Sequence, residues 1–274
     1  MLSVIIPASN EAALIGRCLT ALFASPPPQG GGEVVVVANG CRDATVARAG
    51  AMEAVAKAAG WGLLVLDLAE GGKPLALNAG DAAAQGDMLA YLDADVVVSP
   101  GLIGQLVAAL AGTKPRYATG TPRIPRPASA VTRAYAGFWQ RLPFAAETVA
   151  PGYGLFAVNA AGRARWGAFP AIISDDTYVR LQFTPGERVQ VAASYDWPMI
   201  EGFGRLVRVR RRQDTGVAEV DRLFPGLLAR EAKPKLTPAR LLALALSDPL
   251  GFATYAAVSL AVRLRRGEGW TRGR

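Results

Sequence analysis

Four short apolar runs, each followed by a helical pattern, constrain the fold of the first third of the chain more than any other feature. The runs cover residues 2–6, 34–37, 63–68 and 88–92. Each is short and almost wholly apolar, which is typical of a strand buried on both faces of a sheet. Helices are expected between and after them, at about residues 10–23, 44–59, 74–84 and 101–111. This alternation predicts an α/β fold with a mostly parallel central sheet flanked by helices.

Polar side chains follow all four runs. The loops after the runs carry Ala8 with Glu11, Asn39 with Asp43, Lys73, and Asp93 with Asp95. Because the carboxyl ends of parallel strands meet at one edge of a sheet, ligands bind there in open α/β folds. We therefore expect these four loops to converge on one ligand site.

Asp93 and Asp95 come directly after the fourth run. Side chains at positions i and i+2 of an extended segment share a face, and Ala94 between them points the other way. Two adjacent carboxylates repel each other unless a cation or hydrogen-bond donors intervene, and a divalent metal carrying a nucleotide diphosphate would serve. Asp is also common in solvated turns, so this stretch alone leaves both interpretations open. The convergence of four polar loops favours the metal interpretation.

Composition excludes several kinds of chemistry. The 274 residues contain no histidine, which removes Ser-His-Asp catalysis, His-ligated zinc and His general bases. The only cysteines, Cys18 and Cys41, are too few for a disulfide framework, and a reducing compartment is the simpler interpretation. The net charge of +8 suits an anionic ligand, a nucleic acid or an anionic membrane. The first residues enter a strand with no basic segment before it, so no signal peptide is expected.

The pattern is less regular beyond residue 112. We expect strands at residues 117–120 and 155–158, a helix at 129–141 and an acid-rich helix start at 172–177. Gly152-Tyr-Gly-Leu-Phe-Ala157 matches a dinucleotide-binding pattern but lacks the strand before it and the helix after it. Residues 204–212 contain five arginines, for which phosphate binding is a more economical interpretation than a nucleic-acid patch. A solvated basic face is the alternative.

The C-terminal stretch, residues 241–262, is apolar but interrupted at Asp248, Pro249 and Gly251. Its uninterrupted part is too short to cross about 30 Å of hydrocarbon. Three arginines follow it, so a helix lying in a membrane interface with a basic edge is one interpretation. A helix packed on the rest of the protein is the other, and the sequence does not decide between them.

An ordered set of short motifs resembles family 2 of the inverting glycosyltransferases, which have the GT-A fold. The opening strand and its Pro7-Ala-Ser-Asn-Glu11 turn are similar to the start of that family. The stretch from Gly72-Lys-Pro-Leu-Ala-Leu-Asn-Ala-Gly80 through Gly86-Asp87 to Asp93-Ala-Asp95 resembles its Lys…Asn-x-Gly, Gly-Asp and Asp-x-Asp series. Ser174-Asp175-Asp176 resembles the acid pair that carries the catalytic base. The resemblance covers about residues 1–215.

The resemblance implies that a sugar moves in one displacement from a nucleotide-diphosphate sugar to an acceptor hydroxyl, with Mn²⁺ or Mg²⁺ as cofactor. It implies that Asp176 is the general base, that Asp95 holds the metal, and that Asp93 contacts the ribose or the metal shell. The nucleotide pocket would be lined by Pro7, Ala8, Glu11, Asn39 and Lys73. Arg208 or Arg211 would neutralise the departing diphosphate.

Two departures from the family pattern affect these expectations. Ala38 stands where the family has an Asp that helps to bind the nucleotide, and Asn39 stands for the second Asp, so uridine cannot be assumed. The Gln/Arg-x-x-Arg-Trp signature of processive synthases is missing, which favours transfer of a single sugar over polymer synthesis. A non-catalytic protein that binds nucleotide sugars or glycans stays an alternative because of Ala38. A sugar-phosphate nucleotidyltransferase is disfavoured because residues 7–11 lack a glycine-rich basic loop.

We expect three functional parts in the chain. Residues 1–112 would bind the donor, residues 113–215 would bind the acceptor and carry the base, and residues 216–274 would form a C-terminal helical extension. The expected partners are a nucleotide-diphosphate sugar and a glycan or lipid-linked acceptor in polysaccharide, glycolipid or related glycoconjugate synthesis, and not a nucleic acid. A cytoplasmic location is expected, with peripheral contact between the tail and the inner face of the membrane left open.

Overall fold

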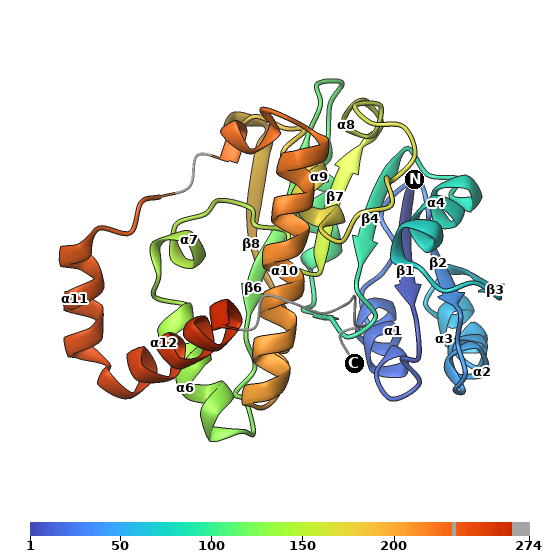
Figure 1. Ribbon diagram of the computed structural model, residues 1–274. Helices are drawn as coiled ribbons and strands as arrows, with labels where there is room; N and C mark the ends of the chain where they lie inside the picture. Colours follow the sequence, from blue (N-terminus) through green and yellow to red (C-terminus); the bar gives the residue numbers. More distant parts are fainter. Residues whose placement is uncertain (232–233, 265–274) are drawn as a thin grey trace. The chain divides into compact units, whose positions relative to one another are not determined.

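The computed structural model describes residues 1–231 and 234–264, which form two compact units (Figure 1). Unit 1 comprises Met1–Arg123, Ala150–Ala171 and Asp175–Trp197. Unit 2 comprises Ile124–Val149, Ile172–Ser174 and Pro198–Arg274, and its described part ends at residue 264.

The first half of unit 1 is the parallel sheet that the sequence predicts. Its strands are β1 (Leu2–Ala8), β2 (Gly32–Asn39), β3 (Gly62–Leu68) and β4 (Met88–Leu92). They pair in parallel in the order β3-β2-β1-β4, with Ile5 opposite Val35 on one side and Tyr91 on the other. Every residue of β2 is buried, which agrees with a strand that is covered on both faces.

Four more strands extend the sheet beyond β4. They are β5 (Val97–Val98), β6 (Tyr117–Arg123), β7 (Leu155–Asn159) and β8 (Arg188–Asp196), in the order β4-β7-β6-β8-β5. β7 runs antiparallel to both β4 and β6, β5 runs antiparallel to β8, and β6 and β8 are parallel. The sheet is therefore mixed. The sequence did not predict β5 or β8, because β8 mixes polar and small residues and has no continuous apolar run.

Alternate residues of β1 build the core on the two faces of the sheet. Val4 and Ile6 belong to one apolar cluster, which α1 (Ile15–Phe23) and α5 (Leu102–Leu110) complete with several buried leucines. Ile5 points to the other face, where it packs with Leu77 of α4 (Lys73–Ala83) and with the aromatic side chains of β4, β6 and β7. The helices thus flank the sheet as expected, and α4 is fixed directly beside the carboxyl ends of β1 and β4.

One expected helix is broken in the structure. The segment predicted as a helix over residues 44–59 forms α2 (Thr45–Gly50) and α3 (Glu53–Ala58), with a turn at residues 51–52. Gly50 at the end of α2 is the physical reason, because glycine disfavours the helix interior by about 1 kcal/mol relative to alanine. Unit 1 is completed by α8 (Ala160–Arg163), α9 (Asp175–Arg180) and a short 3₁₀ turn, η1 (Pro185–Glu187).

Unit 2 is helical. It contains α6 (Ala130–Trp139), α7 (Pro143–Ala146), α10 (Phe203–Leu223), η2 (Leu227–Glu231), α11 (Pro238–Ser247) and α12 (Pro249–Leu264). Its apolar core joins Tyr135 of α6, Leu206 and Val207 of α10, and Val258 of α12. Tyr255 of α12 adds a stacked contact with Tyr135, at 5.6 Å between ring centroids.

The C-terminal extension therefore contains a helix, α12, that packs on other helices through one of its faces. Within the described residues, no helix is both long enough and apolar enough to cross a bilayer. The expected boundary at residue 215 falls inside α10, and that at residue 112 falls in the turn after α5. The functional division that these boundaries describe stays a prediction.

Candidate active site

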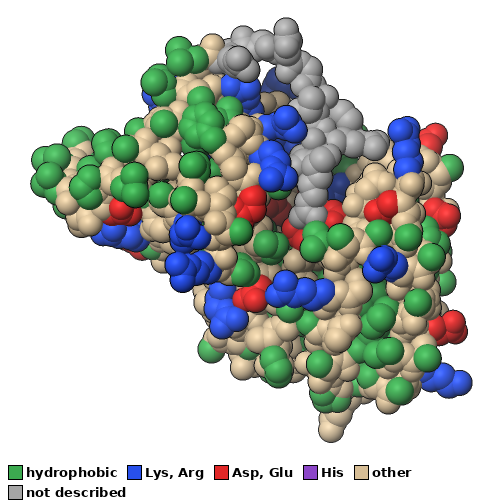
Figure 2. Space-filling model, turned by 90° about the horizontal axis from the view of Figure 1, so that it is seen from below, with side chains coloured by type: hydrophobic (Ala, Val, Ile, Leu, Met, Phe, Trp, Pro, Cys, Tyr) green, Lys and Arg blue, Asp and Glu red, His purple; other side chains and the backbone are tan. Residues whose placement is uncertain are grey.

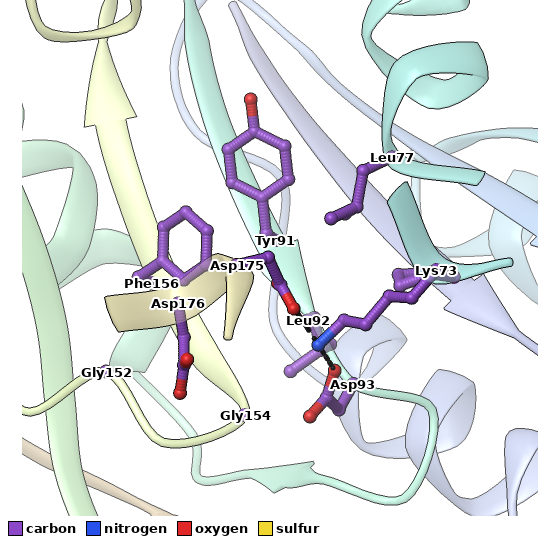
Figure 3. Close-up of a pocket in the computed structure, with 11 residues that line it drawn as sticks. Lys73, Leu77, Tyr91, Leu92, Asp93, Gly152, Gly154, Phe156, Asp175 and Asp176 are labelled. Carbon is purple, nitrogen blue, oxygen red and sulfur yellow. Dashed lines mark ion pairs between the residues drawn. The ribbon is translucent and has the colours of Figure 1, made fainter. Parts of the chain in front are cut away.

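A pocket of unit 1 lies where β1 and β4 end, beside the first residues of α4 and α9 (Figure 3). Segments that are far apart in the sequence meet in it: the ends of β1 and β4, the glycine-rich loop before β7, and the starts of the two helices. The lining residues are Pro7, Lys73, Leu77, Tyr91, Leu92, Asp93, Gly152, Gly154, Phe156, Asp175 and Asp176. The pocket thus brings together the sequence-predicted residues Pro7, Lys73, Asp93 and Asp176, and adds others.

Lys73 is the central cation of the pocket. Its Nζ lies 2.9 Å from Oδ1 of Asp93 and 3.3 Å from Oδ2 of Asp175 (Figure 3). Burial by itself would lower the pKa of Lys73, but the charges of Asp175, Asp93 and Asp176 raise it above its ordinary value, so the side chain is an ammonium. Lys73 is also the first residue of α4, and the free N–H groups at a helix N-terminus favour anions. The sequence predicted Lys73 in this pocket but not its contact with Asp175.

Asp175 and Asp176 begin α9 and have different surroundings. Asp175 is buried, with 3% of the residue exposed, and its carboxylate points to Lys73 (Figure 3). Burial raises the pKa of Asp175, as do the charges of Asp176 and Asp93, while Lys73 opposes that rise. Asp176 is partly exposed, and its Oδ1 accepts a hydrogen bond of 2.6 Å from the N–H of Thr177. Asp176 therefore presents a carboxylate that is accessible from the pocket and held at the start of a helix.

Asp93 is positioned by the glycine-rich loop at residues 152–154, which lacks the sequence context of a dinucleotide site. The Asp93 N–H donates a 2.8 Å hydrogen bond to the carbonyl of Gly154. Gly154 has a φ of +67°, and a Cβ there would lie 2.8 Å from a Val96 methyl and 3.4 Å from Oδ2 of Asp93. Only glycine fits this position, because both the backbone conformation and the close approach exclude a side chain. Gly152 and Gly154 therefore form a wall of the pocket, a role that their spacing alone did not reveal.

Asp95 lies two residues after Asp93, is partly exposed, and is not among the residues that line the pocket. Burial raises the pKa of the Cys18 thiol, and the charges of Asp95 and Asp93 raise it further, so both carboxylates lie near the same side chain. Ala94 between them is buried in the core, as the alternation of side chains predicts.

The donor set can be tested against the predicted metal. Among the described residues, no group of three or more His, Cys, Asp or Glu side chains could hold a metal ion by itself. Mg²⁺ and similar hard cations are, however, commonly held by one or two carboxylates and take their other ligands from substrate phosphates and water. Asp93 and Asp95 supply such carboxylates. The residues present therefore fit a divalent cation that binds together with a diphosphate.

Asn39 links three loops at the carboxyl edge of the sheet. Its Nδ2 donates to the carbonyl of Ala8 at 2.9 Å, and its Oδ1 accepts from the N–H of Gly72 at 2.9 Å. Next to it, Gly40 has a φ of +55°, and a Cβ there would lie 2.8 Å from the backbone of Gly71. In this structure the Asn39 amide therefore joins the ends of β1 and β2 to the start of α4. The predicted contact between Asn39 and a nucleotide stays a prediction.

The turn after β1 is fastened to the turn after β2. The N–H of Glu11 donates to Oγ1 of Thr45 at 2.8 Å, and the N–H of Ala12 donates to a carboxylate oxygen of Asp43 at 3.1 Å. Ala8 is buried, whereas Glu11 is partly exposed, and neither lines the pocket. Asp43, which the sequence analysis placed in the converging loops, has a structural role at this position.

Arg208 and Arg211 both lie on α10, in unit 2. Arg211 donates to the carbonyls of Ala261 and Val262 in the last turn of α12, at 2.5 and 3.4 Å, as cations often do at a helix C-terminus. Arg208 is exposed. The two arginines thus differ in their surroundings, and their predicted contact with a diphosphate stays a prediction.

The Asn-x-Gly motif on α4 holds this helix, which begins with Lys73, against its neighbours. The Asn78 side chain donates to the carbonyl of Phe169 at 3.0 Å and accepts from its N–H at 2.6 Å. A Cβ at Gly80 would lie 2.4 Å from Cγ2 of Ile5, so glycine lets α4 lie directly on β1. On the same helix, Asp81 accepts hydrogen bonds from Tyr91 and Arg163. The motif was visible in the sequence, but these partners were not.

Known proteins share the family and the fold of this chain. The family model described as glycosyl transferase family 2 matches residues 3–163, and no curated protein matches the chain. The mannosyltransferase PcManGT from Pyrobaculum calidifontis, solved with GDP-Man and Mn²⁺, is 21% identical, with a TM-score of 0.61 over 97% of this chain and 76% of that chain.

Two further solved structures are similar. S. aureus TarS 1–349 in complex with UDP-GlcNAc is 16% identical, with a TM-score of 0.56 over 95% of this chain and 81% of that one. Glucosyl-3-phosphoglycerate synthase from Mycobacterium tuberculosis, solved with Mn²⁺, UDP and glucosyl-3-phosphoglycerate, is 20% identical, with a TM-score of 0.55 over 86% of this chain and 81% of that one. At these identities the likeness demonstrates a shared fold, which confirms the expected GT-A architecture. Since the family model matches more than half of the residues, this chain belongs to glycosyl transferase family 2 and is a nucleotide-sugar glycosyltransferase.

Proposed function

We propose that this enzyme is a metal-dependent inverting glycosyltransferase that moves one sugar from a nucleotide-diphosphate sugar to an acceptor hydroxyl. The observation that carries the proposal is the pocket in which Lys73 and Asp93 lie beside the acid pair Asp175 and Asp176. One side of this pocket offers a cation and a helix N-terminus to a diphosphate. The other side offers a carboxylate to a hydroxyl. An inverting transfer needs both groups in one place.

On the donor side, Lys73 and the N-terminus of α4 would bind diphosphate oxygens. Asp95, with Asp93 beside it, would hold Mn²⁺ or Mg²⁺, which when bound neutralises charge on the leaving diphosphate. Pro7 lines the pocket, and the neighbouring Ala8, Glu11 and Asn39 would complete the nucleotide side. Arg208 and Arg211 are proposed as further contacts with the diphosphate.

On the acceptor side, Asp176 would act as the general base. Its carboxylate would take the proton of the acceptor hydroxyl while the hydroxyl oxygen attacks the anomeric carbon from the face opposite the diphosphate. The bond between that carbon and the diphosphate oxygen breaks in the same step, and the configuration inverts. With no histidine in the chain, a carboxylate is the side chain best suited to this role. Asp175 would keep Lys73 oriented, since it is buried and points to the ammonium.

The donor would be a guanosine or uridine diphosphate sugar, because the similar structures were solved with GDP-Man, UDP-GlcNAc or UDP. The acceptor would be a glycan or a lipid-linked hydroxyl, in the synthesis of a polysaccharide or glycoconjugate. Peripheral contact between the C-terminal helices and the inner face of a membrane belongs to the same proposal, since a lipid-linked acceptor is presented at a bilayer surface.

The substitution Asp176→Asn tests the central assignment. We expect sugar transfer and slow donor hydrolysis to fall by about 10²–10⁴-fold, because a positioned base contributes about that much. Donor binding should survive, measured as thermal stabilisation by a panel of GDP- and UDP-sugars with and without Mn²⁺.

The exposed Asp67 on β3 lies outside the pocket and provides a control, Asp67→Asn, that should keep full activity. Unchanged donor hydrolysis in Asp176→Asn would show that the base is another group. If no nucleoside diphosphate stabilised the parent protein, the donor site would be refuted. That result would favour a non-catalytic glycan-binding protein of the same fold.

A further inference from the structure

The net positive charge of the protein belongs to unit 2. The residues of unit 1 include 12 Lys and Arg against 14 Asp and Glu, whereas those of unit 2 include 18 against 8. The net charge is therefore −2 for unit 1 (12 − 14) and +10 for unit 2 (18 − 8), which together give the +8 of the chain. A charge asymmetry of this kind indicates an interaction with an extended polyanion or an anionic surface.

The most exposed apolar side chains lie in the same unit. Among the described residues, the large apolar side chains that are more than 60% exposed are all leucines of α11 and α12: Leu242 at 61%, Leu246 at 74%, Leu250 at 72% and Leu264 at 74%. Single exposed leucines are ordinary on protein surfaces. Four of them occur within 23 residues, on two consecutive helices, and we name these four side chains together the leucine ridge.

Helix geometry explains why the ridge faces away from the core of unit 2. Leu242 and Leu246 are one turn apart on α11, so they share a face, and none of the ten residues of α11 is buried. On α12, Val258 and Tyr255 take the opposite side and pack into the core of unit 2. The leucines therefore do not serve the folding of this unit.

Basic side chains accompany the ridge. Arg240 is on α11, where it forms an ion pair with Glu147, and Arg263 is in the last turn of α12. On α10, Arg205 and Arg212 are exposed at i and i+7, on one side of the helix. In Figure 2 hydrophobic side chains gather on the part of the surface at the left, which α11 occupies in Figure 1, and Lys and Arg side chains lie near them.

Extending the membrane contact that the proposed function includes, we propose that α11 and the exposed side of α12 dock onto a bilayer that contains anionic phospholipids, with the leucine ridge inserted at the level of the head groups. Apolar insertion combined with basic attraction is how amphipathic helices bind in the plane of a membrane without crossing it. A second copy of the chain is a poorer occupant, because it would bring two strongly basic units together. A nucleic acid would match the charge but gives the leucines no partner.

The test is sedimentation of the full-length protein with lipid vesicles, which does not depend on the proposed transfer reaction. Vesicles of phosphatidylcholine with about one-third phosphatidylglycerol should bind the protein, and phosphatidylcholine alone should bind it at least tenfold more weakly. Raising NaCl from about 0.1 to about 1 M should release it from the anionic vesicles, since the Debye length falls from about 10 to about 3 Å.

The double variant Leu246→Gln/Leu250→Gln identifies the surface. Both side chains are exposed, so the fold should be kept, which an unchanged melting temperature verifies. Partitioning onto anionic vesicles should fall by about 100-fold, because removing each leucine from an apolar environment costs about a factor of ten. The matched control Leu64→Gln, an exposed leucine of unit 1, should bind vesicles like the parent.

Three outcomes would overturn the proposal. They are no binding of the parent protein to anionic vesicles at low salt, equal binding of the parent and the Leu246→Gln/Leu250→Gln variant, and a leucine-dependent dimer that ignores vesicles. Donor-induced thermal stabilisation, measured on the same variant, should equal that of the parent. A failure of lipid binding is thereby distinguished from a failure of the donor site.

Discussion

Replacing Lys73 by methionine removes the cation that joins the two acidic sides of the pocket. The Lys73 ammonium lies 2.9 Å from Asp93 and 3.3 Å from Asp175, whose side chain is 5% exposed. Removing one partner of a fully buried ion pair costs about 3–5 kcal/mol, because the remaining charge is left without compensation. The Lys73 side chain is itself 39% exposed, so water replaces part of the lost interaction. We therefore expect Lys73→Met to lower the free energy of unfolding by about 1–3 kcal/mol.

The pH dependence of this loss has a definite sign. Without Lys73, burial and the neighbouring carboxylates raise the pKa of Asp175 further above its value of about 3.9 in the unfolded chain. A carboxyl group whose pKa is raised by folding destabilises the protein at high pH, where it must be charged, and ceases to do so once it is protonated. The deficit of Lys73→Met relative to the parent should therefore be largest above about pH 7 and shrink as the pH falls toward 4.

Urea unfolding in the presence of EDTA measures the effect, and a double-mutant cycle assigns it. In Lys73→Met/Asp175→Asn, the asparagine carries no charge to be left uncompensated, so most of the lost stability should return. Lys73→Arg, which keeps the positive charge, should lose less than Lys73→Met. Two results would refute the reasoning: a Lys73→Met protein as stable as the parent at pH 8, or two single losses that simply add in the double variant.

Three further perturbations probe other parts of unit 1. Gly80→Ala should lower the free energy of unfolding by about 1–3 kcal/mol in urea, because the new methyl would lie 2.4 Å from Cγ2 of Ile5. The hydrogen-bonded ion pair with Arg165 lowers the pKa of Glu187 to about 2, so Glu187 stabilises the fold above about pH 4.5 and this contribution is lost as the pH falls toward 2. Glu187→Gln should thus lose about 1–2 kcal/mol at pH 7, and its deficit should vanish near pH 2 in pH-resolved melting curves. Asp95→Asn should abolish the Mn²⁺-dependent part of donor stabilisation, out of a total of about 2.7 kcal/mol for a donor at a concentration of 100 Kd.

Matched variants separate these effects from general damage. Gly104→Ala on α5 introduces a methyl group with nothing within 4 Å, so it should gain up to about 1 kcal/mol where Gly80→Ala loses stability. A neutral result for Gly80→Ala would mean that α4 can move away from β1. Asp67→Asn should keep the Mn²⁺ response that Asp95→Asn loses, and a Mn²⁺ response retained by Asp95→Asn would exclude Asp95 as a metal ligand.

The parallel half of the fold could be predicted because each of its strands is a short, mostly apolar run in the sequence. β2, with every residue buried, appears in the sequence as an unbroken apolar run. β8 could not be predicted in this way, because its residues alternate irregularly between buried and exposed and include Arg188, Gln190 and Asp196. Its place in the sheet depends on pairing with β6 and β5, and such long-range pairing leaves no local signal. The break after Gly50 was local, but a single glycine does not always end a helix.

The candidate site was predictable in its residue types and much less so in its contacts. Asp93 and Lys73 were expected at strand ends that converge on one edge, which follows from parallel topology. The ion pair between Lys73 and Asp175 joins residues about a hundred positions apart and depends on the antiparallel β7, which the spacing of motifs does not describe. The contact of the Arg211 guanidinium with the last turn of α12 was equally unpredictable, because it joins residues fifty positions apart, and the predicted contact of Arg211 with a diphosphate stays a prediction.

The Asn78 side chain binds both backbone groups of Phe169 and so attaches α4 to the segment that precedes α9. Phe169 lies six residues before Asp175, and α4 also carries Lys73 at its first turn. The eleven-residue helix α4 therefore links the position of Lys73 to that of the segment that leads to Asp175 and Asp176. A small shift of α4 would change both sides together, so changes along this helix should alter the affinity for donor and acceptor in concert.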